Sequence, residues 1–354
     1  MKKIALWGVL SLFLFFSKDI FQSEDYLNSL SLRRVRHQDP LEEEARILLE
    51  ALKDNPGDPL FFAHQLIYIF LQIKNPQLKE EILQFAVINL FSHGKPEVRD
   101  FALISAYKIF SSIDREGQKT NLLLKAVPLS IDEIDPGVAN DACLLVQDKV
   151  LELKEIANQE KVLELFIRQF GETYLNERRK GIAEVLERLS KKLERTSLEN
   201  LSAVLLQVLL NHEYLRPDIK QWGPEFNSLF PSFSSLKTFL SILGMLDLQQ
   251  PPQADLRALL KSKEKIKPVV LLWLYELNLE QEVNKFALAE RIVDNFSDQD
   301  NVAYKALSFY ALARLSLPKN TPKELKSKLK SLLEKYTAHP YLGPLAYHIW
   351  GDIS

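Results

Sequence analysis

Cysteine and glycine are both scarce in this chain. Cys143 is the single cysteine, so the chain cannot form an intramolecular disulfide or a zinc site built on several thiolates. Glycine contributes 11 of 354 residues, whereas globular proteins average about 7%. Nucleotide-binding α/β enzymes need glycine at phosphate loops and tight turns, so its scarcity favours a helical protein.

An excess of charge of either sign is also missing. Lys and Arg number 45, Asp and Glu number 47, and the net charge is -2. This balance excludes a strongly basic nucleic-acid binder at the level of the whole chain, and also an acidic tail protein. Hydrophobic residues make up 46% and charged residues 26%, a composition typical of a folded domain.

The sequence lacks the short motifs that usually mark chemistry. It contains no G-x-x-x-x-G-K-[ST], G-x-G-x-x-G, G-x-S-x-G or H-E-x-x-H, and its closest histidines, His339 and His348, are nine residues apart. We therefore assign no catalytic, cofactor-binding or metal-binding residue and predict no cofactor and no small-molecule substrate. His64 lies in an apolar segment and is predicted to be packed, and Cys143 is predicted to be an inert buried thiol.

The first seventeen residues, MKKIALWGVLSLFLFFS, have the pattern of a targeting segment. Two lysines precede an apolar run over 4–16, which is shorter than the roughly 20 residues of a membrane span but typical of a signal peptide. No A-x-A cleavage site follows, so 1–23 is predicted to be either a signal peptide or a membrane tether. We therefore expect the chain to be exported, and to be either free in a periplasm or tethered to an inner membrane. The alternative is a buried helix of a cytosolic protein. Residues 24–40 are predicted to be a linker.

From residue 41 the apolar residues recur with helical spacing. Leu41, Ala45, Leu48 and Leu52 share one helical face, and no sustained alternation of apolar and polar residues indicates a strand. Helices separated by short Pro- and Gly-containing breaks continue to the C-terminus. The sequence predicts an all-α protein.

The helical segments repeat at intervals near 40 residues. Four similar segments begin at Pro59, Pro96, Pro136 and Asn176, and a weaker copy begins at Asn301. Their equivalent residues Phe61, Arg99, Ala139 and Arg179 follow at steps of 38, 40 and 40. Apolar or small residues recur at four-residue steps within them, for example at Val98, Ala102, Ala106, Phe110, Val138, Ala142, Val146 and Val150. One helix pair cannot bury its apolar face alone, so such a period predicts stacked pairs in an α-solenoid.

The segment PEVRDFALISAYKIF resembles the second helix of a HEAT repeat, whose pattern is P-x-V-R-x-x-A-x-x-A-L-x-x-L. The resemblance implies a right-handed αα-superhelix of the HEAT or armadillo type. HEAT repeats usually carry an aspartate six residues before the arginine, but His93 precedes Arg99 and Thr173 precedes Arg179, so that ladder is expected to be broken. The segments ALKDNPGDPLFFAHQLIYIF and LLEKYTAHPYLGPLAYHIWGDI are similar to tetratricopeptide repeats, so a solenoid of that class stays open.

We therefore expect helical repeats over 41–210, an irregular proline-rich insertion over 211–265, and further repeats over 266–354. The insertion is either a hinge or docking loop, or a degenerate repeat. The tyrosines Tyr68, Tyr107, Tyr310 and Tyr347 either line a concave binding surface or belong to the core.

The favoured function is a non-enzymatic scaffold of the bacterial envelope that binds protein partners of unknown identity over an extended solenoid surface. The N-terminal segment could also contact the membrane. One alternative is a helical enzyme with a carboxylate pair near 211–265. The other is a cytosolic nucleic-acid-binding HEAT-like protein, which clusters such as Arg178–Lys180 and Lys261–Lys267 would serve; interspersed acidic residues and the targeting segment argue against it.

Overall fold

The computed structural model describes residues 39–54, 58–132, 134–173, 176–212, 285–318 and 320–353. The regular elements of these ranges are all helical, which confirms the all-α prediction there. Several predicted segments lie outside the described residues: the targeting segment 1–23, nearly all of the linker 24–40, all but the first two residues of the insertion 211–265, and residues 266–284 of the C-terminal repeats. Within these ranges, no helix has both the length and the apolar character that crossing a membrane requires.

The chain divides into two compact units, one ending at Ser92 and the other beginning at His93. The first contains α3 (Pro40–Asp54), α4 (Leu60–Phe70), α5 (Pro76–Leu83), the π-turn η1 (Gln84–Ile88) and the 3-10 turn η2 (Asn89–Ser92). The apolar face expected for α3 is buried at Ala45, Leu48 and Leu52, whereas Leu41 is half-buried.

Asn75 fixes the start of α5 in this first unit. Its side-chain oxygen accepts hydrogen bonds from the backbone N–H groups of Gln77 and Leu78, and Pro76 occupies the first helical position, where no N–H is needed. The side-chain amide of Asn75 also donates to Glu42 on α3, at 3.1 Å. One side chain therefore caps α5 and joins it to α3.

The second unit holds the remaining helices. They are α6 (Pro96–Ile109), α7 (Glu116–Ala126), α8 (Leu129–Asp132), α9 (Pro136–Lys149), α10 (Ile156–Glu172), α11 (Asn176–Ser190), α12 (Arg195–Asn211), α17 (Lys285–Asn295), α18 (Val302–Arg314), α19 (Lys323–Glu334) and α20 (Gly343–Ile353). The 3-10 turns η3 (Phe110–Ser112) and η4 (Val150–Glu152) end α6 and α9.

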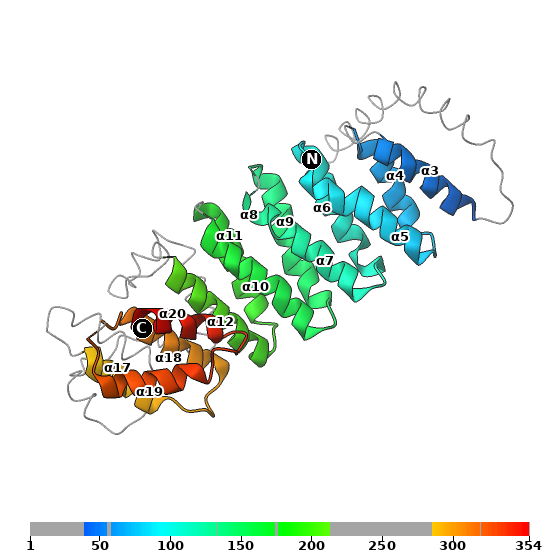
Figure 1. Ribbon diagram of the computed structural model, residues 1–354. Coiled ribbons are helices and arrows are strands. Elements are labelled where there is room, and N and C mark those ends of the chain that lie inside the picture. Colours follow the sequence, from blue (N-terminus) through cyan, green and yellow to red (C-terminus); the bar gives the residue numbers. More distant parts are fainter. Residues whose placement is uncertain are drawn as a thin grey trace. The chain divides into compact units, whose positions relative to one another are not determined.

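Successive helices of this second unit pack in two rows (Figure 1). Helix α9 contacts α6 on one side and α11 on the other, while α10 contacts α7 and α12 in the same way. Ala102, Ala106 and Ala142, predicted from the sequence to face neighbouring helices, are fully buried. Small side chains at these positions allow the helices to approach closely, which explains the regular spacing of alanine in the sequence.

Side-chain hydrogen bonds between neighbouring helices join residues about 40 positions apart. The Tyr107 hydroxyl donates to Asp148 at 3.0 Å, the Ser111 hydroxyl donates to Glu152 at 3.0 Å, and Arg188 Nη1 donates to the Gln147 side-chain oxygen at 2.9 Å. Each of these pairs is 41 residues apart in sequence. The offset agrees with the steps of 38 to 40 residues read from the sequence.

The arginine of the HEAT-like pattern has a hydrogen-bond partner despite the missing aspartate. Arg99 Nη1 donates to the backbone carbonyl of His93, six residues earlier, at 2.5 Å. The His93 side chain instead accepts from the backbone N–H of Lys95 through Nδ1, just before α6 begins. A main-chain carbonyl therefore takes the place that an aspartate side chain would have.

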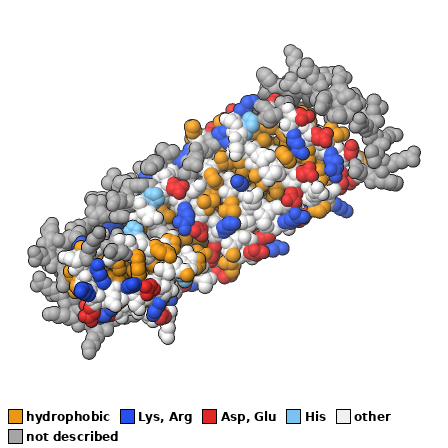
Figure 2. Space-filling view, in the orientation of Figure 1, with side chains coloured by type: hydrophobic (Ala, Val, Ile, Leu, Met, Phe, Trp, Pro, Cys, Tyr) orange, Lys and Arg blue, Asp and Glu red, His pale blue; other side chains and the backbone are white. Residues whose placement is uncertain are grey.

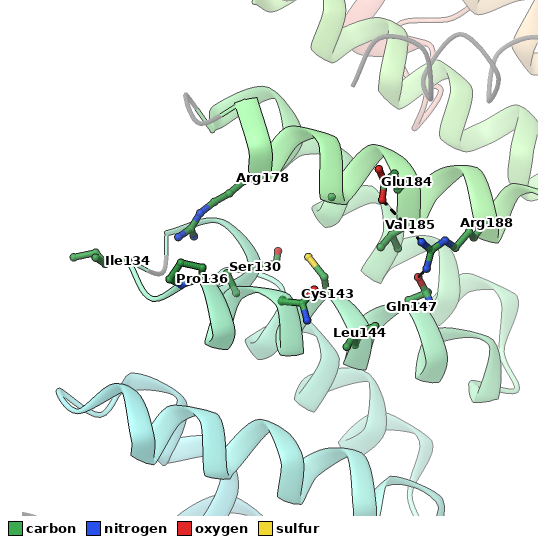
Figure 3. Close-up of a pocket in the computed structure, with 13 residues that line it drawn as sticks. Ser130, Ile134, Pro136, Cys143, Leu144, Gln147, Arg178, Glu184, Val185 and Arg188 are labelled. Atoms are coloured by element: carbon green, nitrogen blue, oxygen red, sulfur yellow. Dashed lines mark hydrogen bonds and ion pairs between the residues drawn. The ribbon is translucent and has the colours of Figure 1, made fainter. Parts of the chain in front are cut away.

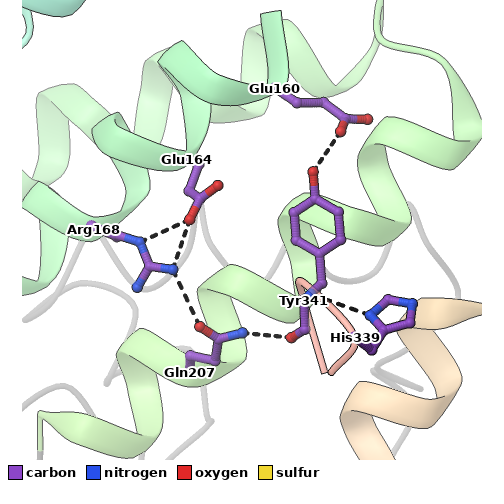
Figure 4. Close-up of polar contacts among 6 residues, drawn as sticks. All are labelled: Glu160, Glu164, Arg168, Gln207, His339 and Tyr341. Atoms are coloured by element: carbon purple, nitrogen blue, oxygen red, sulfur yellow. Dashed lines mark hydrogen bonds and ion pairs between the residues drawn. The ribbon is translucent and has the colours of Figure 1, made fainter. Parts of the chain in front are cut away.

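Helix α18 packs against α12, and a polar cluster joins the segment before α20 to α10 and α12 (Figure 4). The Tyr341 hydroxyl donates to Glu160 at 2.6 Å, and the Gln207 amide donates to the Tyr341 carbonyl at 2.6 Å. Burial, followed by this bond to Glu160, raises the pKa of Tyr341. The His339 Nδ1 accepts the backbone N–H groups of Tyr341 and Leu342. The cluster therefore connects segments that lie far apart in the sequence.

The exposure of the aromatic side chains shows which of them belong to the core and which lie on the surface. His64 is exposed, so its prediction as a packed histidine is wrong: helical position directs it outward although its sequence neighbours are apolar. Tyr310 is buried, whereas Tyr68, Tyr107 and Tyr347 are 64%, 41% and 62% exposed. The tyrosines thus divide between core and surface.

Candidate functional site

Helices α9 and α11 enclose a hollow of about 460 Å³ (Figure 3). Its walls come from the loop before α9, from α9 itself and from the first three turns of α11. Apolar side chains form much of the lining: Ile134, Pro136, Ala139, Leu144 and Val185. Ile134 is 93% exposed and Leu144 is 39% exposed, so the second unit leaves these aliphatic groups uncovered.

Two arginines border this apolar surface. Arg178, at the start of α11, extends toward Ile134 and Pro136, and Arg188 lies near the opposite end beside Gln147 (Figure 3). Arg188 Nη1 donates to Gln147 at 2.9 Å, and its other terminal nitrogen is 3.9 Å from Glu184. The apolar lining therefore has a guanidinium near each end.

A second hollow of about 410 Å³ continues from the first. It shares Gln147 and Arg188 with the first and adds Asp148, Leu151, Leu189, Lys191 and Lys192. Lys191 is 3.5 Å from Glu187 and Asp148 accepts the Tyr107 hydroxyl, so these two charges have partners within the chain. We refer to the two hollows together as the α9/α11 groove.

The groove is open where a glycine takes the place of one member of a carboxyl pair. Between α6 and α9, Asp100 and Asp141 are hydrogen-bonded to each other. Forty residues on, the corresponding positions between α9 and α11 carry Asn140 and Gly181, and both line the hollow. A Cβ atom on Gly181 would meet nothing within 4 Å.

Cys143 lies on the groove wall with its sulfur directed between the two helices (Figure 3). It is half-buried, so the prediction of a buried thiol holds only in part, because its side of α9 faces the hollow. Burial nevertheless raises the pKa of the thiol to about 11, against smaller opposing effects of Ser130 and Arg178. The thiol is therefore protonated near neutral pH and is a weak nucleophile.

The carboxylate pair considered near 211–265 falls outside the described residues, apart from 211 and 212. Within the described residues, Asp100 and Asp141 form a carboxyl pair. Burial and the neighbouring Asp100 raise the pKa of Asp141 to about 6. Glycosidase pairs hold their carboxyl groups about 5 Å or more apart, with the substrate between them. Asp100 and Asp141 instead contact each other directly and do not line the α9/α11 groove, so their arrangement is that of a shared proton between two helices.

The described residues contain no group of three or more His, Cys, Asp or Glu side chains that could hold a metal ion. On the face drawn in Figure 2, basic and acidic side chains are intermixed around exposed hydrophobic ones. A nucleic-acid groove needs a run of positive charge along its length, and this face of the described residues does not offer one. The whole basic cluster 261–267 considered for nucleic acid lies outside the described residues.

Sequence reasoning did not find this groove. It identified α9 and α11 as equivalent segments and named Cys143 and Arg178, but it treated the thiol as core and the arginine as part of a basic cluster. The available signal was the loss of charge at Asn140 relative to Asp100 and the loss of side-chain bulk at Gly181 relative to Asp141. Comparisons of the chain with protein-family models, with curated proteins and with solved structures give no match. Function must therefore be inferred from the geometry of the chain itself.

Proposed function

We propose that the protein is a non-enzymatic scaffold that binds a protein partner along the exposed side of its stacked helices. Its helix pairs would form a right-handed αα-superhelix of divergent HEAT-like repeats. The regular offset of the inter-helix hydrogen bonds supports this arrangement, as do the two rows of neighbouring helices. Stacked helix pairs present extended surfaces, which is why such proteins commonly bind other proteins.

The observation that carries this proposal is the set of uncovered apolar side chains beside an open groove. Ile104 and Tyr107 on α6 and Leu144 on α9 are each about 40% exposed, and Ile134 is almost fully exposed. Single exposed apolar residues are ordinary, but a cluster bordered by charged groups is typical of a protein interface. An interface gains from burying such groups, at roughly 25 cal/mol per Å² of apolar surface.

The cellular location proposed for this scaffold is the bacterial envelope. Support comes from the sequence of 1–17, with its basic start and short apolar run. Fractionation of the native host with mass spectrometry of the mature N-terminus tests it. A chain beginning near Lys18 or Glu24 in a periplasmic fraction, or an intact Met1 in the membrane fraction, would support export. An intact Met1 in the soluble cytosol would contradict it.

Site-directed photo-crosslinking in the native host tests the scaffold function. The crosslinker benzoylphenylalanine is placed in turn at Tyr68, Ile104, Leu144 and Tyr347, all exposed apolar positions, and at exposed Lys323 as a control. We expect a discrete larger species from at least one apolar position and none from the control. If none of the four apolar positions gives a product that the control lacks, the scaffold proposal is wrong.

A further inference from the structure

The charge around the α9/α11 groove indicates what kind of partner it fits. Four cationic side chains line it, Arg178, Arg188, Lys191 and Lys192, against the two carboxylates of Asp148 and Glu184. Asp148 already accepts the Tyr107 hydroxyl, and Glu184 lies 3.9 Å from both Lys180 and Arg188. The groove therefore combines an excess of positive charge with an apolar wall.

The neighbouring groove shows that this positive charge is specific to one place. Between α6 and α9, the side of α9 carries Asp148 and Glu152, which bind Tyr107 and Ser111. At the corresponding positions forty residues later, α11 provides Arg188 and the turn after α11 contains Lys192. The charge at both positions is thus reversed from acidic to basic.

The hydrogen-bonding capacity at these positions changes as well. Ser111 donates to Glu152, but the residue forty positions after Ser111 is Leu151, whose side chain cannot bond to Lys192. Lys192 is exposed and lines the second hollow. Between α6 and α9 this position carries Ser111, which bonds to Glu152. In the α9/α11 groove it carries the aliphatic Leu151, and the ammonium group of Lys192 is exposed.

We propose that the α9/α11 groove binds an acidic segment of the protein partner, one in which aliphatic side chains alternate with Asp or Glu. This inference rests on the scaffold function proposed above. The aliphatic groups would cover Ile134, Pro136 and Leu144, while the carboxylates would reach the guanidinium groups at the two ends of the first hollow and Lys192 beyond it. Charge-assisted hydrogen bonds from arginine to carboxylates are among the stronger polar contacts available for such recognition.

The length of the groove sets the size of this segment. Helix α11 has 15 residues, so it is about 22 Å long at 1.5 Å per residue. An extended chain advances about 3.3 Å per residue, so about seven residues span the groove. In such a segment alternate side chains point to opposite sides, so one set can face the apolar wall while the other reaches the charged edge.

The binding test uses the full-length protein and fluorescent peptides of about ten residues. One alternates Leu with Asp or Glu, a second has Asn and Gln in place of the acids, and a third has Lys. We expect the acidic peptide to bind at least roughly tenfold more tightly than the neutral one, to lose affinity as salt is added, and the lysine peptide not to bind. Equal binding of the three peptides, or no binding of the acidic one, would overturn the proposal.

Cys143 reports whether the peptide occupies this groove. It is the single cysteine of the chain and lies on the groove wall, so alkylation by N-ethylmaleimide, followed by intact mass spectrometry at mildly alkaline pH, gives one signal. We expect a saturating amount of acidic peptide to slow this reaction at least roughly threefold. A peptide that binds without protecting Cys143 docks elsewhere, which would contradict the proposed site.

Variants of the protein distinguish the effect of the groove's charge on peptide affinity from the effect of its shape. Arg188→Glu with Lys192→Glu should weaken the acidic peptide at least roughly tenfold, whereas Lys323→Glu with Lys330→Glu on α19 gives the same change in net charge away from the groove and should change affinity less than roughly twofold. Gly181→Leu should also weaken binding, because it fills the hollow without changing charge. Circular dichroism establishes that each variant is folded. Unchanged affinity in both groove variants would overturn the proposal, whereas the scaffold function is decided separately by crosslinking.

Discussion

Helix α9 borders two grooves, one shared with α6 and one with α11, and they are built from equivalent positions. In the α6/α9 groove, Asp100 meets Asp141 and Tyr107 meets Asp148. In the α9/α11 groove, the corresponding pairs are Asn140 with Gly181 and Gln147 with Arg188. Of these two pairs, Gln147 and Arg188 are joined by a side-chain hydrogen bond. The charged partner in this pair is the cation Arg188, whereas in the α6/α9 pair it is the anion Asp148.

This difference separates residues that maintain the stack from residues that alter its surface. The buried positions are alike in both helix pairs, since Ala102 and Ala142 are both completely buried. The positions at the edge of the helix contact vary instead, because their side chains fill the groove, bridge it or leave it open. A binding surface can therefore be created in one groove without disturbing the packing that stabilises the array.

The largest effect is expected from converting the open groove into a copy of its neighbour. Asn140→Asp, Gly181→Asp, Arg188→Asp and Lys192→Glu together restore the acidic set found between α6 and α9. The acidic peptide should lose roughly 100-fold in affinity, about 2.8 kcal/mol, because attraction at two positions becomes repulsion. Fluorescence anisotropy measures the affinity.

A control for this conversion keeps a positive charge at both positions and exchanges only the two residue types. Arg188→Lys with Lys192→Arg should retain binding within roughly tenfold, although a lysine cannot form the bidentate contact of an arginine. If the variant with four substitutions bound the acidic peptide as well as the native chain does, the difference between the two grooves would have no bearing on recognition.

Two helical glycines provide the next contrast, in stability. A Cβ on Gly171 of α10 would lie 2.5 Å from Val208 Cγ1 and 2.8 Å from the His212 ring, whereas one on Gly181 of α11 would meet nothing within 4 Å. Gly171→Ala should lower the free energy of unfolding by about 1–3 kcal/mol, since a branched side chain must shift. Gly181→Ala should raise it by up to about 1 kcal/mol through better helix propensity.

Urea unfolding followed by circular dichroism measures both substitutions in parallel. Because the two changes are chemically identical, differences in the unfolded chain largely cancel and the packing around each glycine decides the sign. Equal effects of the two substitutions would mean that Gly181 does not face open space. That result would remove the structural basis for the groove.

The all-helical class of the described residues could be predicted from the sequence, because burial on one face of a helix follows a simple period. The four-residue steps through Val98, Ala102 and Ala106 identified a face that is buried throughout. The prediction that His64 is packed was wrong because it relied on the apolar neighbours of His64 in sequence, whereas the side chain points outward from the helix. Neighbouring residues indicate the composition of a helix, and only the period indicates its faces.

The groove could not be predicted in this way. It depends on pairs of side chains from different helices, such as Asn140 with Gly181, whose 41-residue offset matters only once the helices are in register. Single residues gave misleading signals: Cys143 had the neighbours of a core residue, and Arg178 had those of a solvated cluster. Aligning the repeats and comparing charge at each position would have shown the reversal from Asp148 to Arg188 and from Glu152 to Lys192.

The smallest effect concerns the carboxyl pair that fills the α6/α9 groove. The folded-state pKa of Asp141 is raised to about 6 by burial and by its bond with Asp100, whereas an unfolded aspartate titrates near 3.9. The folded chain therefore retains a proton that the unfolded chain releases between those values. The contribution of Asp141 to stability is fully present below about pH 4 and is lost as pH rises through about 6.

Asp141→Asn removes this titration while keeping an N–H that can donate to Asp100. At pH 8 we expect the variant to be more stable than the native chain by on the order of 1 kcal/mol, a value reduced for the partial solvent exposure of the pair. At pH 4 the two should agree closely. The matched change Asn140→Asp in the α9/α11 groove places a carboxyl opposite Gly181, where it has no acidic counterpart, and should not produce this pH dependence. Urea unfolding across this pH range decides between the two grooves: a pH-dependent loss in both would mean that the direct contact between Asp100 and Asp141 is not what distinguishes them.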